Sequence, residues 1–197
     1  MQTAWSYEID GSSIPPLLTV EAFNEITGGK YGNSYAVSQA LLAASQAVRN
    51  ECGWHISPSL NCKANPLPTN GVLRLPSNCV TAVTAVKESG VTLDSSAYEW
   101  LRMGLVRRAD GKHWCNRWAA IEVDYTAGFT ADAVPDVVEA VRSIAEGVLA
   151  VTAGVVSESA DGVSISYSAN ASSIAAALTQ QQKAALAPYK VVDSHAA

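Results

Sequence analysis

The sequence has little charge, and most of that charge is negative. Charged residues make up 16% of the 197 residues, and the formal net charge at pH 7 is −5. Surfaces of small soluble domains commonly carry about 25–35% charged residues, so the low content favours a surface that contacts other subunits. An alanine- and serine-rich free surface is the alternative. The acidic balance argues against electrostatic binding to DNA or to anionic membranes.

The sequence also lacks a membrane segment, a secretion signal, an internal repeat and a disulfide framework. No apolar run reaches the roughly 18 residues that a membrane-spanning helix requires. A chain of this length buries roughly 70% of its unfolded surface, so it requires no metal or disulfide to fold. We expect a protein with free thiols, made in a reducing cytoplasm and without a membrane partner. The four cysteines are irregularly spaced: Cys52, Cys62, Cys79 and Cys115.

The stretch from Ile121 to Gly154 predicts a strand, a tight turn and a long helix. Apolar residues alternate with Glu122 and Asp124, which is the period of a half-buried strand. Gly128 breaks this strand. Pro135 can begin the helix, because proline lacks the backbone N–H that would have no partner in the first turn. Gly154 is a plausible stop. One apolar stripe recurs at helical spacing: Val137, Val138, Val141, Ile144, Ala145, Val148 and Leu149.

The residues before this stretch predict an extended segment, two helices and a loop. Residues 1–16 form the extended segment, in which Trp5, Tyr7 and Ile9 alternate with polar residues as in a short strand. One helix is expected over residues 17–26 with Thr19 as its N-cap, and a longer one ends at Cys52. Its expected apolar stripe is Val37, Ala40, Leu41, Ala44 and Val48. Residues 54–70 hold three prolines and are expected to form a loop.

Short segments between the two long helices predict an antiparallel sheet. Strands are expected over residues 72–75, 80–87 and 98–106, the last interrupted at Gly104. Asp110-Gly111 is the strongest hairpin signal, followed by an aromatic-rich segment over residues 113–118.

Residues 155–197 predict a C-terminal arm. Val163, Ile165 and Tyr167 alternate with serines, which indicates a strand. Thr179 opens a capping-box pattern, so a short helix is expected there, ending at Pro188. The predicted fold class is α+β. It is a small helical bundle, with two long helices plus short ones, that carries an antiparallel β insertion at about residues 71–126. Residues 17–154 are the expected core.

Two cysteine–histidine combinations contain residue types that can bind zinc or carry out nucleophilic chemistry. Cys52, His55 and Cys62 supply three zinc ligands, whereas structural zinc sites use four. Packing of the cysteine against a neighbouring tryptophan is the simpler interpretation. His113 and Cys115 would share one face of a strand, so a nucleophilic pair is geometrically feasible. No third orienting group is indicated, and core packing is favoured, although a small hydrolase stays open.

The remaining polar clusters have plain structural interpretations. Three acidic residues at the start of the long helix suit its dipole: Asp132, Asp136 and Glu139. Three arginines flank a strand and suggest a solvated edge: Arg102, Arg107 and Arg108. Gly28-Gly29-Lys30 lacks the rest of a phosphate-binding loop. No catalytic, cofactor-binding or metal site is therefore predicted.

Six segments occur in a familiar order: Asn50–Gly53, Gly71–Pro76, Val80–Gly90, Val123–Phe129, Asp161–Tyr167 and Leu186–Lys190. In this order and spacing the chain resembles the head-to-tail adaptor, or head–tail connector, of long-tailed bacteriophages. The resemblance covers about residues 17–190. The N-terminal segment and the residue 54–70 loop lie outside these motifs.

The resemblance implies a structural virion protein at the head–tail junction, made in the bacterial host cytoplasm. Such adaptors form a twelve-subunit ring that binds the portal protein with a C-terminal arm and receives the tail, through a neck or terminator protein, on its other side. DNA passes through the ring without specific binding. Aromatic and apolar residues of the arm are the expected subunit or portal anchors: Tyr167, Leu186, Pro188 and Tyr189. The alternative is that they fold back on their own subunit.

Two further functions stay open. A tail-completion or tail-terminator ring protein would form six-fold rings, so a subunit count separates it from an adaptor. A DNA-binding module would hold duplex DNA at moderate salt, which the acidic net charge argues against.

Overall fold

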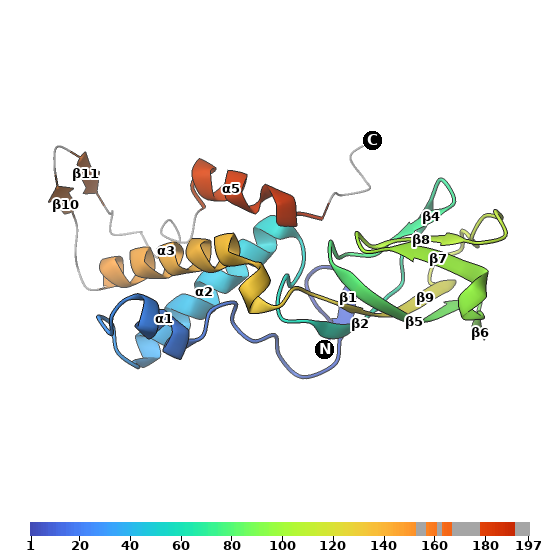
Figure 1. Cartoon of the computed structure of the whole chain (residues 1–197), viewed down its shortest axis with the longest axis horizontal. Coiled ribbons are helices and arrows are strands. Elements are labelled where there is room, and N and C mark those ends of the chain that lie inside the picture. Colours follow the sequence, from blue (N-terminus) through green and yellow to red (C-terminus); the bar gives the residue numbers. More distant parts are fainter. Residues whose placement is uncertain (153–156, 161–162, 167–177, 192–197) are drawn as a thin grey trace. The chain divides into compact units, whose positions relative to one another are not determined.

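The computed structural model describes residues 1–152, 157–160, 163–166 and 178–191 (Figure 1). The fold is α+β, as predicted, and the chain divides into two compact units. The β unit consists of Met1–Ile14, Cys52–Thr130 and Tyr189–Ala197. The helical unit consists of Pro15–Glu51 and Ala131–Pro188. Each unit is therefore assembled from segments that are distant in the sequence.

The N-terminal half of the helical unit follows the predicted pattern. Helix α1 spans Val20–Ile26, and the Thr19 hydroxyl caps it by accepting a hydrogen bond from the Ala22 N–H at 3.2 Å. Helix α2 spans Tyr35–Cys52. All five residues of the stripe predicted for α2 are buried, because their spacing places them on one face: Val37, Ala40, Leu41, Ala44 and Val48.

Two buried polar side chains of α2 fix the segment that precedes α1. The Ser45 hydroxyl accepts a hydrogen bond from the Leu17 N–H at 2.9 Å. The Arg49 guanidinium is only 3% exposed and donates to the Pro15 carbonyl at 2.6 Å. Buried polar groups require such partners, so these bonds explain how α2 tolerates a serine and an arginine on its packed face.

Helix α3 spans Pro135–Thr152 and begins at the predicted proline. Five residues of its predicted stripe are buried: Val137, Val141, Ile144, Ala145 and Leu149. Val138 and Val148 are half-buried at the margins of the stripe. The predicted end of this helix at Gly154 lies outside the described residues.

Helix α5 spans Gln180–Leu186 and confirms the predicted capping box. The Thr179 hydroxyl accepts from the Gln182 N–H at 3.2 Å, and the Gln182 side chain accepts from the Thr179 N–H at 2.8 Å. A short 3₁₀ turn, η3, follows over Ala187–Tyr189 and includes Pro188.

An antiparallel strand pair precedes α5 in the chain. Strand β10 covers Ser157–Ala160 and pairs with β11, which covers Val163–Ser166. Strand β11 was predicted, whereas no strand was predicted over the residues of β10.

The β unit holds two antiparallel sheets. In the first, the order is β1-β2-β9-β5-β6, so β9 lies between β2 and β5. Its strands are β1 Tyr7–Ile9, β2 Leu60–Ala64, β9 Ile121–Ala127, β5 Val80–Glu88 and β6 Val91–Thr92. In the second, the order is β3-β4-β8-β7. Its strands are β3 Pro68–Thr69, β4 Val72–Arg74, β8 Leu105–Arg108 and β7 Tyr98–Leu101. Two 3₁₀ turns complete the described elements: η1 Ser95–Ala97 and η2 Ala131–Ala133.

Strand β9 alternates as predicted, with one buried face and one polar face. The polar face carries Glu122 and Asp124, and both pair with lysines of the neighbouring strands. Lys63 of β2 lies 3.4 Å from Glu122 and 3.5 Å from Asp124, and Lys87 of β5 lies 2.5 Å from Glu122. The hydrogen bond from Lys87 is the main reason that the pKa of Glu122 is lowered. The predicted acidic face is thus electrically compensated.

The predicted loop over residues 54–70 is wrong in its second half. Strand β2 begins after Pro58 and ends before Pro66, and Pro68 opens the edge strand β3, where its missing N–H removes no ladder bond. Strand β2 pairs with β1 on one side and β9 on the other. The sheet region therefore begins before the expected residue 71.

The predicted hairpin at Asp110-Gly111 is also wrong, because residues 113–118 form no strand. Asp110 instead accepts hydrogen bonds from the Arg108 side chain and the Lys112 N–H. Two-residue hairpin turns form instead at Asn70-Gly71 between β3 and β4, with φ of +52° and +78°, and at Ser89-Gly90 between β5 and β6, with φ of +53° and +82°. Positive φ at both positions is what a two-residue hairpin turn requires.

Along the stretches of chain that the structure describes, no helix combines the length and the apolar character that crossing a membrane takes.

Candidate functional site

His55 is buried in the β unit and is held by three hydrogen bonds. Its Nε2 lies 2.9 Å from the Ala127 carbonyl, which can only accept, so Nε2 carries the proton. Nδ1 then accepts from the Tyr7 hydroxyl at 2.7 Å, and the Tyr7 hydroxyl accepts from the His55 N–H at 3.0 Å. Each of these polar groups is satisfied, so His55 connects β1 and β9 as a neutral structural residue.

The three sequence candidates for zinc do not form a site. Burial raises the pKa of the Cys62 thiol to about 12, which opposes the thiolate that a metal requires. His55 uses both ring nitrogens in hydrogen bonds within the β unit. No cluster of three potential ligand residues suited to a metal ion occurs in the described ranges.

His113 and Cys115 do not form the nucleophilic pair that their spacing in the sequence would allow. The Cys115 N–H donates to Glu88 at 2.7 Å, and the thiol has its pKa lowered mainly by hydrogen bonds from Arg117. The His113 ring faces Gly71 instead, since a Cβ at that glycine would lie 3.1 Å from His113 Nδ1. No hydrogen bond joins the two side chains in the described part, so the structure offers no base for the thiol.

Cys115 is nevertheless the thiol that should react first. It is half-buried with a lowered pKa, whereas the other three cysteines, also free, are buried. A lower pKa raises the thiolate fraction at neutral pH, and the thiolate is the reactive form. We expect a chromogenic disulfide reagent at pH 7 to label one thiol per chain rapidly and the rest slowly. Cys115→Ser should remove the fast phase, and a fast phase that survives this change would contradict the assignment.

The four predicted anchor residues have different environments. Tyr167 lies outside the described residues. Leu186 is fully buried at the end of α5, which packs against α3. Pro188 is exposed. Tyr189 is half-buried in the β unit, where its ring lies 5.7 Å from that of Phe129 and its carbonyl accepts from the Trp54 indole at 2.7 Å. Three of the candidates are therefore described, and of these Pro188 is the exposed one.

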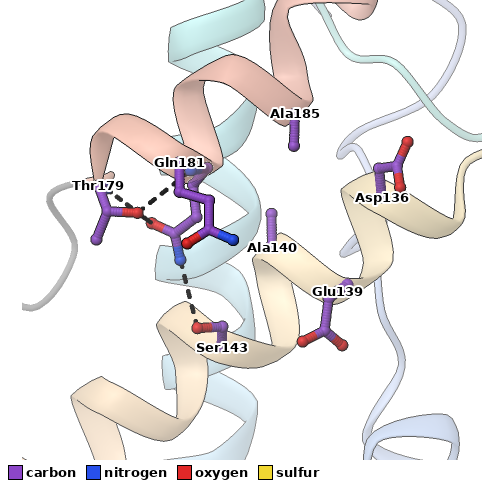
Figure 2. A pocket seen from close by; sticks show the side chains of 8 residues that line it. Asp136, Glu139, Ala140, Ser143, Thr179, Gln181 and Ala185 are labelled. Atoms are coloured by element: carbon purple, nitrogen blue, oxygen red, sulfur yellow. Dashed lines mark hydrogen bonds between the residues drawn. The ribbon is translucent and has the colours of Figure 1, made fainter.

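A polar pocket of about 370 Å³ lies between α3 and α5 (Figure 2). The Gln182 side chain crosses it and donates to the Ser143 hydroxyl at 3.3 Å. Figure 2 shows Ala140 and Ala185 pointing toward each other where the helices approach. Its lining residues are Asp136, Glu139, Ala140, Ser143, Thr179, Gln181, Gln182 and Ala185.

The acidic residues of this pocket are not arranged for acid–base chemistry. Glu139 receives two hydrogen bonds from the Arg142 guanidinium, at 2.5 and 2.8 Å, and this pairing lowers its pKa. Arg142 also pairs with Glu146 one turn further along α3. Asp132 lies in η2 and does not line the pocket. Of the predicted acidic cluster, Asp136 therefore lies in the first turn of α3 and Glu139 forms an ion pair with Arg142.

A second hollow, of about 410 Å³, lies on the four-stranded sheet and is mostly apolar. It is lined by Val72, Glu99, Trp100, Leu101, Leu105 and Arg107. Sequence analysis missed it, because the strand pattern of residues 98–106 does not show which apolar side chains stay exposed. Leu101 is 57% exposed and Met103 is 52% exposed.

The three arginines predicted to line a solvated edge each have a defined partner. Arg107 pairs with Glu99 at 2.6 Å, and Arg108 pairs with Glu88 and Asp110. The hydrogen bonds from Arg108 hold the pKa of Asp110 well below its ordinary value. Arg102 lies 5.9 Å above the ring of Phe129. All three arginines therefore interact with acidic or aromatic side chains of the β unit.

Comparison with known proteins finds the fold but no family. No protein-family model and no curated protein match the sequence. A chain in the neck of an empty gene transfer agent particle, computed with C6 symmetry, superimposes with a TM-score of 0.61 at 18% identity. A chain in the neck of a native particle, computed with C12 symmetry, gives 0.61 at 16% identity.

A chain in the virion of a native gene transfer agent particle has the same fold, with a TM-score of 0.57 at 16% identity. Each likeness covers 97% of this chain and 98% of the compared chain. At such low identity the comparisons establish a shared fold.

Proposed function

We propose that this chain is a structural subunit of the neck of a bacteriophage-like virion and not an enzyme. Twelve copies would form a ring that joins the portal to the tail and continues the DNA channel. The observation that carries this proposal is the likeness to neck chains over almost the whole length of both partners. Near-complete coverage in both directions means that no large catalytic insertion distinguishes this chain from those neck components.

The electrostatics of the chain agree with this role. The net charge is −5, and two arginines of the β unit, Arg107 and Arg108, already pair with Glu88, Glu99 and Asp110. Tight phosphate binding depends on such cations. A ring of acidic subunits would let DNA pass without holding it.

The C-terminal arm, residues 155–197, is the proposed portal-binding element. Pro188 is exposed and suits a direct contact. Leu186 and Tyr189 are packed within their own subunit, so their use as anchors would require α5 and η3 to leave their present positions. Tyr167 is proposed as an anchor on its sequence pattern alone.

The test is the assembled mass of the protein alone and with a candidate portal ring. We expect twelve subunits, or a monomer that joins the portal only when the arm is present. A truncation after Ala160 removes α5 and should abolish portal binding. Pro188→Glu leaves α5 in place and should weaken binding at least tenfold, with Gln181→Glu, an exposed position on α5, as its control. A stable monomer that ignores the portal with or without the arm would contradict the proposal.

A tail-completion or tail-terminator ring is the second candidate function. One of the similar neck chains belongs to a structure computed with C6 symmetry, the order expected for that class. The same mass measurement separates the two functions, because a six-subunit ring that binds tail tubes rather than portal would favour the terminator.

A further inference from the structure

The apolar hollow of the four-stranded sheet has the properties of a binding site. Trp100, Leu101, Val72 and Leu105 form its walls, and its volume of about 410 Å³ suits a large side chain. Trp100 and Leu101 belong to β7, an edge strand, and are 37% and 57% exposed. Apolar side chains gathered around a concavity, rather than scattered singly, mark interaction surfaces.

At the rim of the hollow, the carboxylate of Glu99 accepts hydrogen bonds from the described part of the chain through only one of its two oxygens. The Nε and one terminal nitrogen of Arg107 both donate to the same oxygen of Glu99, Oε2, at 2.8 and 2.6 Å. Glu99 Oε1 has no hydrogen-bond partner within the described residues, and the side chain is 56% exposed. A cation on an approaching partner would find an acceptor there.

Trp118 is the most exposed large apolar side chain of the described residues, at 88%. It lies between Arg117 and Ala119 in the connection from β8 to β9. The Arg117 guanidinium donates to the Ser89 hydroxyl at 3.0 Å, and the Ala120 carbonyl accepts from the Ser89 N–H at 2.6 Å. These bonds fix the connection to the turn between β5 and β6. The segment that carries the Trp118 indole is therefore held in place on both sides of that residue.

We propose that the hollow on β4, β7 and β8 receives Trp118 of a neighbouring copy, with Arg117 of that copy reaching Glu99. This inference rests on the proposed ring. Identical subunits close a ring through heterologous contacts, in which two different surfaces of each subunit complement one another. The β unit offers such a pair: an apolar hollow with a free carboxylate oxygen, and a projecting indole beside a guanidinium. Tryptophan and arginine are also the residues that most often dominate interface energetics.

Complementary variants test this contact. Trp118→Ala removes the projecting side chain, and Leu101→Glu places a charge in the hollow. We expect each variant alone to self-associate at least about 30-fold more weakly than the wild type, measured by sedimentation velocity. A mixture of the two should form one-to-one pairs that grow no further, because only one of the two possible contacts is intact.

Matched controls separate this contact from general surface effects. Tyr35→Ala removes an aromatic side chain that is 80% exposed, and Val91→Glu charges an apolar position that is 65% exposed. Both should assemble like the wild type. Thermal melting of every variant establishes that it is folded. Arg117→Glu should weaken the contact, and adding Glu99→Lys should restore part of it.

The outcomes distinguish this inference from the proposed function. Every variant is assayed alone up to the highest soluble concentration and again on a portal ring. Rings that form equally well from Trp118→Ala and Leu101→Glu would overturn the contact and leave the neck function standing. A wild-type chain that stays monomeric in both settings would overturn both.

Discussion

Replacing Gly128 by alanine is expected to lower the free energy of unfolding of the β unit by about 4 kcal/mol. A Cβ at this position would lie 2.3 Å from the Pro58 carbonyl oxygen and 2.8 Å from the Ser59 Cα, which are backbone atoms that cannot rotate away. Gly128 also has a φ of +129°, which other residues rarely adopt. The expected fall in the thermal midpoint is about 10 °C, measured by calorimetry.

Two glycine variants serve as controls for this prediction. Gly147 lies within α3 with open space around its Cα, so Gly147→Ala should stabilise the protein by about 0.5–1 kcal/mol through helix propensity. Gly32→Ala meets no atom within 4 Å and should incur only the strain of its φ of +62°. Equal losses of stability for Gly128→Ala and Gly32→Ala would contradict the prediction, because they would show that the clash with Pro58 adds nothing to the strain of a positive φ.

Replacing Tyr7 by phenylalanine is expected to cost about 3 kcal/mol of stability. The hydroxyl of Tyr7 donates to His55 Nδ1 and accepts from the His55 N–H. Without it, two buried polar groups of a fully buried histidine lose their partners, and each incurs a desolvation penalty. Chemical denaturation followed by tryptophan fluorescence would measure the loss, because Trp54 is adjacent and buried.

Tyr125→Phe is the matched control, because it removes the same atom from another strand, β9, of the same sheet. Tyr125 is as buried as Tyr7, but its hydroxyl makes no hydrogen bond of standard length and direction to the described residues and lies beside the weakly polar thiol of Cys62. We expect this change to be nearly neutral. A similar loss from both substitutions would place the effect in packing rather than in the hydrogen bonds to His55.

The parts of the fold that sequence analysis predicted well have strong local signals. Strand β9 shows strict alternation, and α3 combines a proline start with a helical apolar stripe, so periodicity alone fixes both. The Thr19 cap and the Thr179 capping box were also predicted, because each depends on residues within one turn.

The errors arose where pairing partners outweigh local composition. Strand β2 is short, lies between prolines and has only two buried residues, Cys62 and Ala64. It is a strand because β1 and β9 flank it, and neither partner is near it in sequence. At Asp110-Gly111 the side-chain pairing of Asp110 with Arg108 produces a turn without a hairpin.

The candidate interaction surface could not be located from the sequence. Trp118 was assigned to an aromatic-rich segment, and Trp100 to a strand, but their exposure depends on which neighbours cover them after folding. The burial of the predicted anchors could not be predicted either. Leu186 is an apolar residue of the arm, and it is buried because α5 packs against α3.

The discontinuous make-up of the β unit has a consequence for synthesis on the ribosome. Its first strand comes from residues 7–9, whereas the carbonyl that binds Trp54 belongs to Tyr189, and the Val191 N–H bonds to the Cys52 carbonyl. The nascent sheets therefore cannot acquire these last bonds until residue 191 has left the exit tunnel. Well before that, strand β2 waits with an open edge until β9, over residues 121–127, has emerged, and an open edge is liable to pair with other chains. We expect this stage of translation to be when the polypeptide depends most on chaperones.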